Sequence, residues 1–321
     1  MTKWSPGRAA RLLVATAITA FILWKANPSS VAAVVLRTDA RWILFAIALV
    51  IVDRTLMAYR WLVLLRPIDR ASRLPFGAVM RIFFVSTFLG TFLPASVGGD
   101  AVRAYGLAQL RVPAGPAVAS VLMDRLLGVL SIAIIGVIGL LLAPSQGDLL
   151  ATWAVAVSLA VAAAGCAIGA AVVFSERAAA LAQRVAMRLP FAAVRSLGSE
   201  LTQATRAYAR FHGELLNVLA GSVAVQVLRV LQAWCLGRAL GIDASMVTYF
   251  AFVPLILLVM LLPVSINGIG TSQAAFVWFF GRAGVPSADA FALSVLFLAL
   301  GVIGNLPGGL LYAFGPRATP A

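Results

Sequence analysis

The feature that most constrains this chain is a short segment that occurs twice inside strongly apolar sequence. Leu93 to Gly99 reads LPASVGG, and 169 residues later Leu262 to Gly268 reads LPVSING. Proline and glycine interrupt a helix, and lipid offers no water to satisfy the backbone groups that the interruption frees. Such breaks persist in a membrane where they face protein or a polar cavity. Two matched breaks therefore predict a transport path built from two related halves.

A weaker repeat precedes each break. The segment RTLMAY, which begins at Arg54, resembles RVLQAW, which begins at Arg229, at an offset of 175 residues. The similar offsets indicate duplication of one unit. We therefore expect one integral membrane domain over residues 1–321, with repeat 1 at 10–142 and repeat 2 at 150–314.

Composition places the chain in a membrane. It is 62% hydrophobic and 11% charged, which is far from the composition of a soluble protein. The net charge of +14 would suggest nucleic acid in a soluble chain, but the arginines here gather at the ends of apolar segments, where anionic lipid headgroups lie. Cys166 and Cys235 lie inside apolar runs, and His212 is the only histidine. We therefore expect no nucleic-acid partner, no disulfide framework, no metal and no cofactor.

The length of the apolar segments predicts an all-α polytopic membrane protein with about six full spans and two broken, re-entrant hairpins. The hairpins are expected at 76–110 and 246–281, because their arms of roughly 13 to 18 residues are short for crossing about 30 Å of hydrocarbon. Alternatively, the arms cross fully and the chain has as many as ten spans. The full spans are expected at about 10–26, 42–65, 116–142, 150–174, 215–237 and 288–314.

The first apolar run also has the layout of a cleavable signal peptide. Arg11 and Lys25 can reach opposite membrane surfaces and let a short helix span, so we expect a retained first span. The polar linker at 175–214 is either a cytoplasmic connector between the halves or a helix on the lipid surface. Pro190 and Gly198 are expected to divide any helix there.

The charge distribution predicts the orientation of the two halves. With a cytoplasmic N-terminus, the expected inner segments hold 15 Lys and Arg residues and the outer segments hold 5, as the positive-inside rule requires. Each half is then span, span, hairpin, span, with an odd number of crossings, so the halves are inverted and the hairpins enter from opposite sides. Inverted repeats with broken helices commonly build alternating access around a site near the midplane.

Several charged residues fall within the expected spans. A charge near the centre of a spanning helix costs roughly 2.5 to 3.5 kcal/mol, so it normally pairs or faces a wet cavity. Asp53 and Arg54 lie near mid-membrane, Asp124 and Arg125 lie nearer the cytoplasmic end, and Arg229 occupies the place in repeat 2 that corresponds to Arg54. Neighbours in sequence point apart on a helix, so Asp53 and Arg54 are expected to have different partners. The charges either join helices or line a polar path, and we favour the path.

The first break ends in residues suited to an anion. Gly98 and Gly99 permit a tight turn, and Asp100 is a good N-terminal residue for a new helix. A helix N-terminus is a natural seat for phosphate, and Arg103, about one turn later, could donate to the same anion. Ser96 could satisfy freed backbone groups or bind a headgroup.

The second break offers comparable groups, and a helix is expected to begin there at Thr271 or Ser272. Ser265 corresponds to the serine of the first break and has the same two expected roles. The predicted substrate-binding residues of this break are Ser265, Asn267, Gly268, Gly270 and Thr271.

Three motifs in order carry a family resemblance: PASVGGD from Pro94 with Arg103, DRLLG from Asp124, and PVSINGIGT from Pro263. Over most of its length the chain resembles the flippase-like transmembrane family of the lysylphosphatidylglycerol synthase membrane region. The resemblance implies translocation of an aminoacylated phospholipid, which a separate soluble domain makes in two-part relatives, or a role in polyprenyl-linked glycan machinery. We expect the membrane module alone here. Relatives tend to have Gly-Gly-x-Gly-Thr and then an acid where this chain has Asn267 and Gln273.

The motifs and the resemblance together predict a lipid flippase or scramblase of the bacterial inner membrane, with both termini cytoplasmic. The phosphate of a phospholipid or polyprenyl-linked lipid would be held between the hairpin tips while the tails stay in lipid. We expect no catalytic residues, and a lipid-modifying enzyme could act with the chain. The alternatives are a membrane enzyme or accessory subunit acting on a lipid-linked substrate, and a small-solute transporter or channel.

Overall fold

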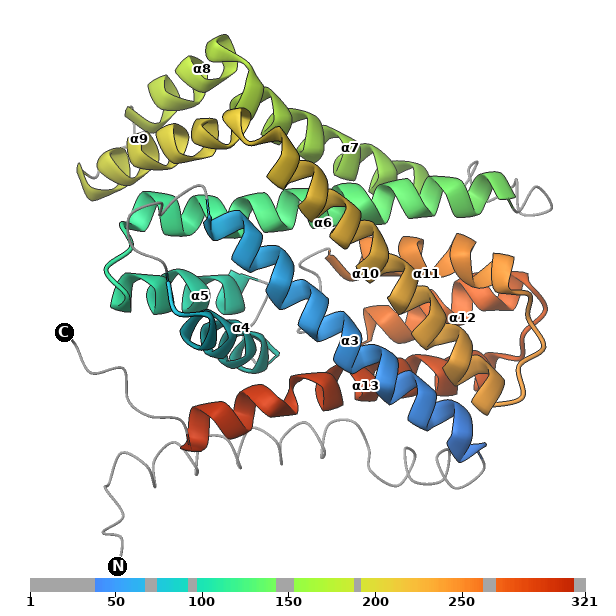
Figure 1. The fold of residues 1–321 in the computed structure, drawn as a ribbon. Helices are drawn as coiled ribbons and strands as arrows, with labels where there is room; N and C mark the ends of the chain where they lie inside the picture. Colours follow the sequence, from blue (N-terminus) through green and yellow to red (C-terminus); the bar gives the residue numbers. More distant parts are fainter. Residues whose placement is uncertain are drawn as a thin grey trace, which may run out of the picture.

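The structure is a computed structural model that describes residues 38–66, 74–91, 97–142, 153–187, 192–261 and 270–314. Within these ranges every regular element is helical (Figure 1). The α-helices are α3 (Ala40–Leu65), α4 (Phe76–Gly90), α5 (Val97–Gln109), α6 (Ala114–Leu142), α7 (Trp153–Phe174), α8 (Glu176–Met187), α9 (Ala192–Ala207), α10 (His212–Ala239), α11 (Met246–Leu261), α12 (Thr271–Arg282) and α13 (Ser287–Phe314), and a 3₁₀ turn, η2 (Tyr208–Arg210), precedes α10. The span expected at 10–26 lies outside the described residues.

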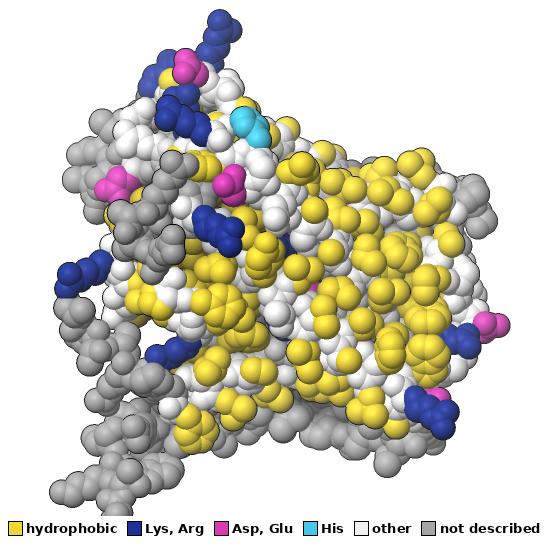
Figure 2. Space-filling view, viewed as in Figure 1, with side chains coloured by type: hydrophobic (Ala, Val, Ile, Leu, Met, Phe, Trp, Pro, Cys, Tyr) yellow, Lys and Arg dark blue, Asp and Glu magenta, His cyan; other side chains and the backbone are white. Residues whose placement is uncertain are grey.

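Four of the described helices, α3, α6, α10 and α13, are long and apolar enough to cross a membrane. They match the spans expected at 42–65, 116–142, 215–237 and 288–314, and α7 matches the helix expected at 150–174. Large apolar side chains face outward from them, and Leu44 on α3 is 66% exposed. Figure 2 shows a broad hydrophobic surface, with Lys and Arg toward its edges. Such a surface suits contact with lipid.

Helices α3 and α10 form a central antiparallel pair that runs diagonally across Figure 1. The backbone N–H of Asp39, which caps α3, donates to the carbonyl of Ala239 at the end of α10, at 3.2 Å. Near the same end the rings of Trp42 and Trp234 meet edge to face, with centroids 5.1 Å apart. The pair brings Arg54 and Arg229, which the sequence repeat aligns, to facing helices.

Helices α4 and α5 form an antiparallel pair at the left of Figure 1. Their backbones come into close contact at Gly90 and Gly99, where a Cβ added to Gly90 would lie 2.9 Å from the Cα of Gly99. Farther along, Gly106 packs against Ile82. The helix ends beside the first break are thus held together by two glycines, while residues 92–96 lie outside the described residues.

The expected turn at Gly98 and Gly99 is wrong. Helix α5 already begins at Val97, so both glycines lie in its first turn and Asp100 follows them inside the helix. Gly99 instead makes a close backbone contact with α4, where an added Cβ would lie 3.0 Å from the carbonyl oxygen of Ser86 and 3.2 Å from the Cα of Gly90.

Helices α11 and α12 form a second antiparallel pair at the right of Figure 1. Tyr249 and Phe280 meet with ring centroids 5.0 Å apart at the end of the pair away from the break. As expected, α12 begins at Thr271. Its N-cap is Gly270, whose φ of 90° lies in a region that suits glycine, and its N–H donates to Gln273 Oε1 at 2.6 Å.

Two glycine contacts join the outer long helices to these pairs. On α6, a Cβ added to Gly139 would collide with the carbonyl of Phe250 on α11. On α13, a Cβ added to Gly308 would collide with the carbonyl of Phe84 on α4. Glycine at both positions lets the helix backbones touch.

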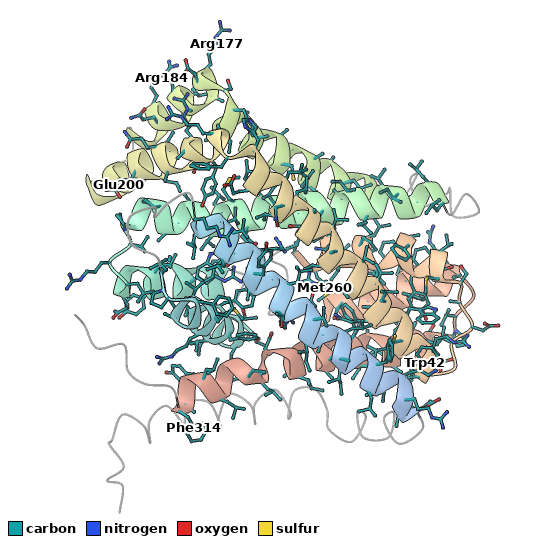
Figure 3. All side chains as sticks on the ribbon, in the orientation of Figure 1. Trp42, Arg177, Arg184, Glu200, Met260 and Phe314 are labelled. Carbon is teal, nitrogen blue, oxygen red and sulfur yellow. The ribbon has the colours of Figure 1, made fainter. Side chains whose placement is uncertain are left out.

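The linker forms α8 and α9 at the top of Figure 1, where Arg177 and Arg184 on α8 point outward (Figure 3). Gly198 was expected to divide a helix, but it lies inside α9, because one glycine costs a helix only about 1 kcal/mol. Pro190 lies outside the described residues.

The linker is fixed to the core by Tyr208 in η2. Its hydroxyl is fully buried and donates to the carbonyl of Leu64 on α3 at 2.7 Å. Burial raises the pKa of Tyr208 above its ordinary value, so the hydroxyl keeps its proton and remains a donor into alkaline pH.

Candidate functional site

A cavity of about 300 Å³ lies where the central helices meet the ends of the helix pairs. Its volume is at the lower end of the range of small-ligand sites. It is lined by Arg54, Met57 and Arg60 of α3; Ser86, Thr87, Gly90 and Thr91 at α4; Gly99, Asp100 and Arg103 of α5; Asp124, Arg125, Gly128, Val129 and Ile132 of α6; Gln226 and Arg229 of α10; Leu261 of α11; and Asn305 of α13.

Both helix pairs reach this cavity with the ends that adjoin a break. The end of α4 contributes Gly90 and Thr91, the first turn of α5 contributes Gly99 and Asp100, and the last residue of α11, Leu261, also lines the wall. Described helix ends next to each of the two breaks therefore border one polar cavity.

Asp124 on α6 is shared by two arginines. Its Oδ1 lies 2.8 Å from Nη2 of Arg60, and its Oδ2 lies 2.9 Å from Nη1 of Arg103. All three side chains are less than a tenth exposed. The Arg103 guanidinium also lies over the rings of Phe83, at 4.7 Å, and Trp61, at 5.3 Å. Charge-assisted hydrogen bonds and cation–π contacts together hold Arg103 in one place.

Asp53 on α3 is likewise shared by two arginines. Its Oδ2 lies 2.9 Å from Nη1 of Arg54, and its Oδ1 lies 3.5 Å from Nε of Arg229 on α10. Met57 Sδ accepts from both guanidinium groups, at 3.5 and 3.4 Å. The expectation that Asp53 and Arg54 have different partners is wrong, because the long arginine side chain bends back to its neighbour.

The third acid, Asp100, pairs with Arg125. The guanidinium Nε and Nη2 lie 2.8 and 3.1 Å from the two carboxylate oxygens, which is a bidentate arrangement. Arg125 is 42% exposed, more than the other cavity arginines that form these ion pairs. The carboxylate lies in the first turn of α5, where the helix dipole favours a negative charge.

These contacts leave the cavity positive. Five arginines line it, and three aspartates contact them. Two of the aspartates each serve two arginines and the third serves one, so among the described residues two positive charges are not balanced. Surrounded by apolar helices, such a cavity attracts an anion more strongly than an exposed surface would.

Neutral polar groups complete the wall. Asn305 Nδ2 donates to Thr91 Oγ1 at 2.8 Å, which links α13 to the end of α4. Gln226 Nε2 donates to Ser131 Oγ at 3.3 Å. The amide oxygens of Asn305 and Gln226 are buried and have no hydrogen-bond partner among the described residues. Buried acceptors of this kind are normally satisfied by water or a ligand.

The structure brings together seven of the residues predicted from sequence: Arg54, Gly99, Asp100, Arg103, Asp124, Arg125 and Arg229 all line the cavity. Gly98 lies beside it in α5, whereas Gly270 and Thr271 at the start of α12 are not among the described lining residues. Ser96, Ser265, Asn267 and Gly268 lie outside the described residues.

Sequence reasoning missed Arg60, Gln226 and Asn305 as site residues. Each is a polar residue within a long apolar helix, which is the signal that could have found them. The pattern alone does not say which of the helix faces meet, so their place in one cavity needs the fold.

A model of the family described as lysylphosphatidylglycerol synthase TM region matches residues 8–308 of the chain. No curated protein and no solved structure matches. The family match covers the whole of the cavity lining.

Proposed function

We propose that this chain, which belongs to the lysylphosphatidylglycerol synthase TM region family, is a lipid translocator of the flippase or scramblase type. It binds the phosphate of an amphiphile in the arginine-lined cavity while the apolar tails stay in the bilayer. The observation that carries the proposal is the pair of unbalanced positive charges in a cavity between membrane helices.

The energetic cost of the cavity supports a binding role. Charged side chains within a membrane are expensive, and helix packing alone can be achieved with apolar or small residues. Arg229 is 22% exposed and lies at the long distance of 3.5 Å from Asp53, so its guanidinium can turn toward a ligand at small cost. A phosphate that accepts from such an arginine supplies the missing negative charge.

We further propose that the two halves are inverted repeats with re-entrant hairpins. Two observations support this. Helices α3 and α10, whose sequences correspond, are antiparallel and meet at Asp53. The contact of Gly139 with Phe250 corresponds to that of Gly308 with Phe84, and the two glycines are 169 residues apart, the same offset as the breaks. Alternating access would arise as one half rocks against the other.

The proposed setting is the bacterial inner membrane, with cytoplasmic termini and a lipid-modifying enzyme as partner. The exposed Arg177 and Arg184 of the linker helices support a cytoplasmic linker under the positive-inside rule. We propose transport without covalent chemistry. The carboxylates that adjoin the cavity are each held by arginine, and the described lining residues include no histidine or cysteine.

A leaflet-exchange assay tests the proposal. The full chain is reconstituted into liposomes that contain a trace of tail-labelled anionic phospholipid, and a membrane-impermeant quencher reports how much label reaches the outer leaflet. We expect faster exchange than in protein-free liposomes, and loss of most of that rate in Arg229→Gln.

Arg238→Gln is the matched control. Arg238 lies on the same helix α10, is 45% exposed and is not among the described residues that line the cavity. Its variant should retain the wild-type rate. The proposal is contradicted if wild-type protein leaves lipid exchange unchanged, or if it conducts small ions with no lipid movement.

A further inference from the structure

We infer that the cavity selects a lipid whose headgroup is a phosphate monoester and discriminates against headgroups that carry an ammonium group. The inference rests on the proposed function, because it assigns a substrate class to the same cavity. It follows from the ion pairs that the cavity carboxylates already form with arginines, and from the excess of positive charge that remains.

Each carboxylate oxygen near the cavity already contacts an arginine. The two oxygens of Asp124 face Arg60 and Arg103, and the two oxygens of Asp53 face Arg54 and Arg229. The two oxygens of Asp100 face Arg125. An ammonium group that entered would therefore meet carboxylates whose charge arginine already neutralises. Asp53 Oδ1 accepts no hydrogen bond among the described residues, but Asp53 is 1% exposed and is not among the described residues that line the cavity.

The sequence of the two breaks adds no acidic side chain. Segments 92–96 and 262–269, which adjoin helix ends that line the cavity, contain no Asp or Glu. The carboxylates of the described wall, Asp100 and Asp124, are paired with arginines. The acceptors of the described wall that have no hydrogen-bond partner are the neutral amide oxygens of Asn305 and Gln226. Neutral acceptors bind a cation more weakly than a carboxylate does.

The size of the charge excess favours a monoester over a diester. A phosphate monoester carries about −1.5 to −2 at neutral pH, close to the two unbalanced positive charges, whereas a diester carries a single negative charge. A monoester also presents three terminal oxygens, which suits guanidinium donors from different helices. Arg229 and Arg125 are the more exposed donors, and buried Arg60 and Arg103 add to the local potential.

A headgroup with a net positive charge meets repulsion instead. In a site of low dielectric, like charges separated by a few ångströms repel each other strongly unless counter-charges intervene. An aminoacylated phosphatidylglycerol should therefore bind worse than the same lipid without the amino acid.

Two measurements on the same purified full chain test the inference. Native mass spectrometry measures binding of phosphatidic acid, phosphatidylglycerol, phosphatidylethanolamine and lysyl-phosphatidylglycerol with identical acyl chains, and proteoliposomes report exchange of their tail-labelled forms. We expect binding to fall in that order, with phosphatidic acid ahead of lysyl-phosphatidylglycerol by about tenfold or more. Equal or tighter binding of lysyl-phosphatidylglycerol overturns the inference.

A carboxylate introduced into the cavity wall provides a second, independent test of the headgroup preference. Asn305→Asp keeps the side-chain shape and adds an acid to the wall, so it should reduce the preference for phosphatidic acid over lysyl-phosphatidylglycerol by about tenfold. Asn305→Leu, which is similar in size and adds no charge, should not reduce that preference. Arg229→Gln should reduce it, because it removes one unbalanced charge. An unchanged preference in both Asn305→Asp and Arg229→Gln overturns the inference.

The two assays separate the two proposals. If the binding order holds but no lipid exchanges, translocation fails and the headgroup class stands. If lipid exchanges but binding does not follow charge, the translocator stands and the headgroup class fails.

Discussion

Arg103 on α5 and Asp124 on α6 form an ion pair of 2.9 Å in which both side chains are 8% exposed. The same carboxylate binds Arg60 of α3, so one acid ties three helices together beside the cavity. Arg103 was expected to reach a ligand. That role stays a prediction, and Arg103 does line the cavity. Its ion pair and its place over the Phe83 ring also make it a support that holds the wall in position.

Replacing Arg103 should therefore destabilise the protein. Arg103→Leu removes the ion pair and leaves the buried carboxylate of Asp124 with one partner, which should cost about 3 kcal/mol of unfolding free energy. Arg125→Leu removes a more exposed pair and should cost about 1 kcal/mol or less. Thermal unfolding midpoints of the purified proteins measure both. Equal losses in the two variants would contradict the supporting role of Arg103.

The sharing of Asp53 predicts energetic coupling between α3 and α10. Asp53→Asn leaves the neighbouring guanidinium groups of Arg54 and Arg229 without a counter-charge and should lower the unfolding midpoint. Adding Arg229→Gln removes one of these charges, so the double variant should be more stable than the sum of the single effects implies, by roughly 1 kcal/mol or more. Unfolding of the four proteins of this cycle gives the coupling. Strict additivity would show that the 3.5 Å contact has no energetic consequence.

Much of the fold could be predicted because the physical signal is local. Runs of apolar residues of spanning length predicted α3, α6, α10 and α13. The break pattern predicted that α12 begins at Thr271 or Ser272, and it begins at Thr271. Gly99 shows the limit of this reasoning. A glycine in sequence suggests a turn, but its role here is a close contact with Gly90, which depends on how two helices cross.

The candidate site was predicted in composition but not in its pairings. Arginines and aspartates inside apolar spans indicated a polar path. Arg54, Asp124, Arg125 and Arg229 do line a cavity, whereas Asp53 is buried behind its wall. Asp124 forms ion pairs with both Arg60 and Arg103. These three residues lie on three different helices, so no short sequence pattern predicts the pairing. The opposite error occurred at Asp53, where helical geometry alone wrongly excluded the contact with Arg54.

Tyr208 should fix the linker to the core through one hydrogen bond. Tyr208→Phe keeps the buried ring and removes the donor to the Leu64 carbonyl, so it should cost about 0.5 to 1.5 kcal/mol of unfolding free energy. Tyr105 is 67% exposed on α5, so Tyr105→Phe should change the unfolding midpoint little. A Tyr208→Phe midpoint equal to that of wild type would show that the bond does not stabilise the fold.

The same tyrosine predicts a stability loss in alkali. Burial raises the pKa of Tyr208 above that of the unfolded chain, so its stabilising effect is complete below about pH 10 and declines as pH rises above that value. Unfolding midpoints measured between neutral and strongly alkaline pH should fall more steeply in wild type than in Tyr208→Phe. Parallel curves would contradict the assignment.

If the two halves are repeats, an added methyl group at Gly139 and at Gly308 should destabilise the protein to a similar extent. Gly139→Ala places a Cβ against the Phe250 carbonyl and Gly308→Ala places one against the Phe84 carbonyl, so both helix pairs must move apart. Overpacking of this kind costs about 1 to 3 kcal/mol, seen as a lower unfolding midpoint. Gly301 lies on α13 with Gly308, and a Cβ there meets no described atom within 4 Å, so Gly301→Ala should be neutral or slightly stabilising. Moving either pair also displaces a helix end that lines the cavity. Gly139→Ala and Gly308→Ala should therefore both slow lipid exchange. Slower exchange in only one of the two variants would indicate that the halves have unequal roles.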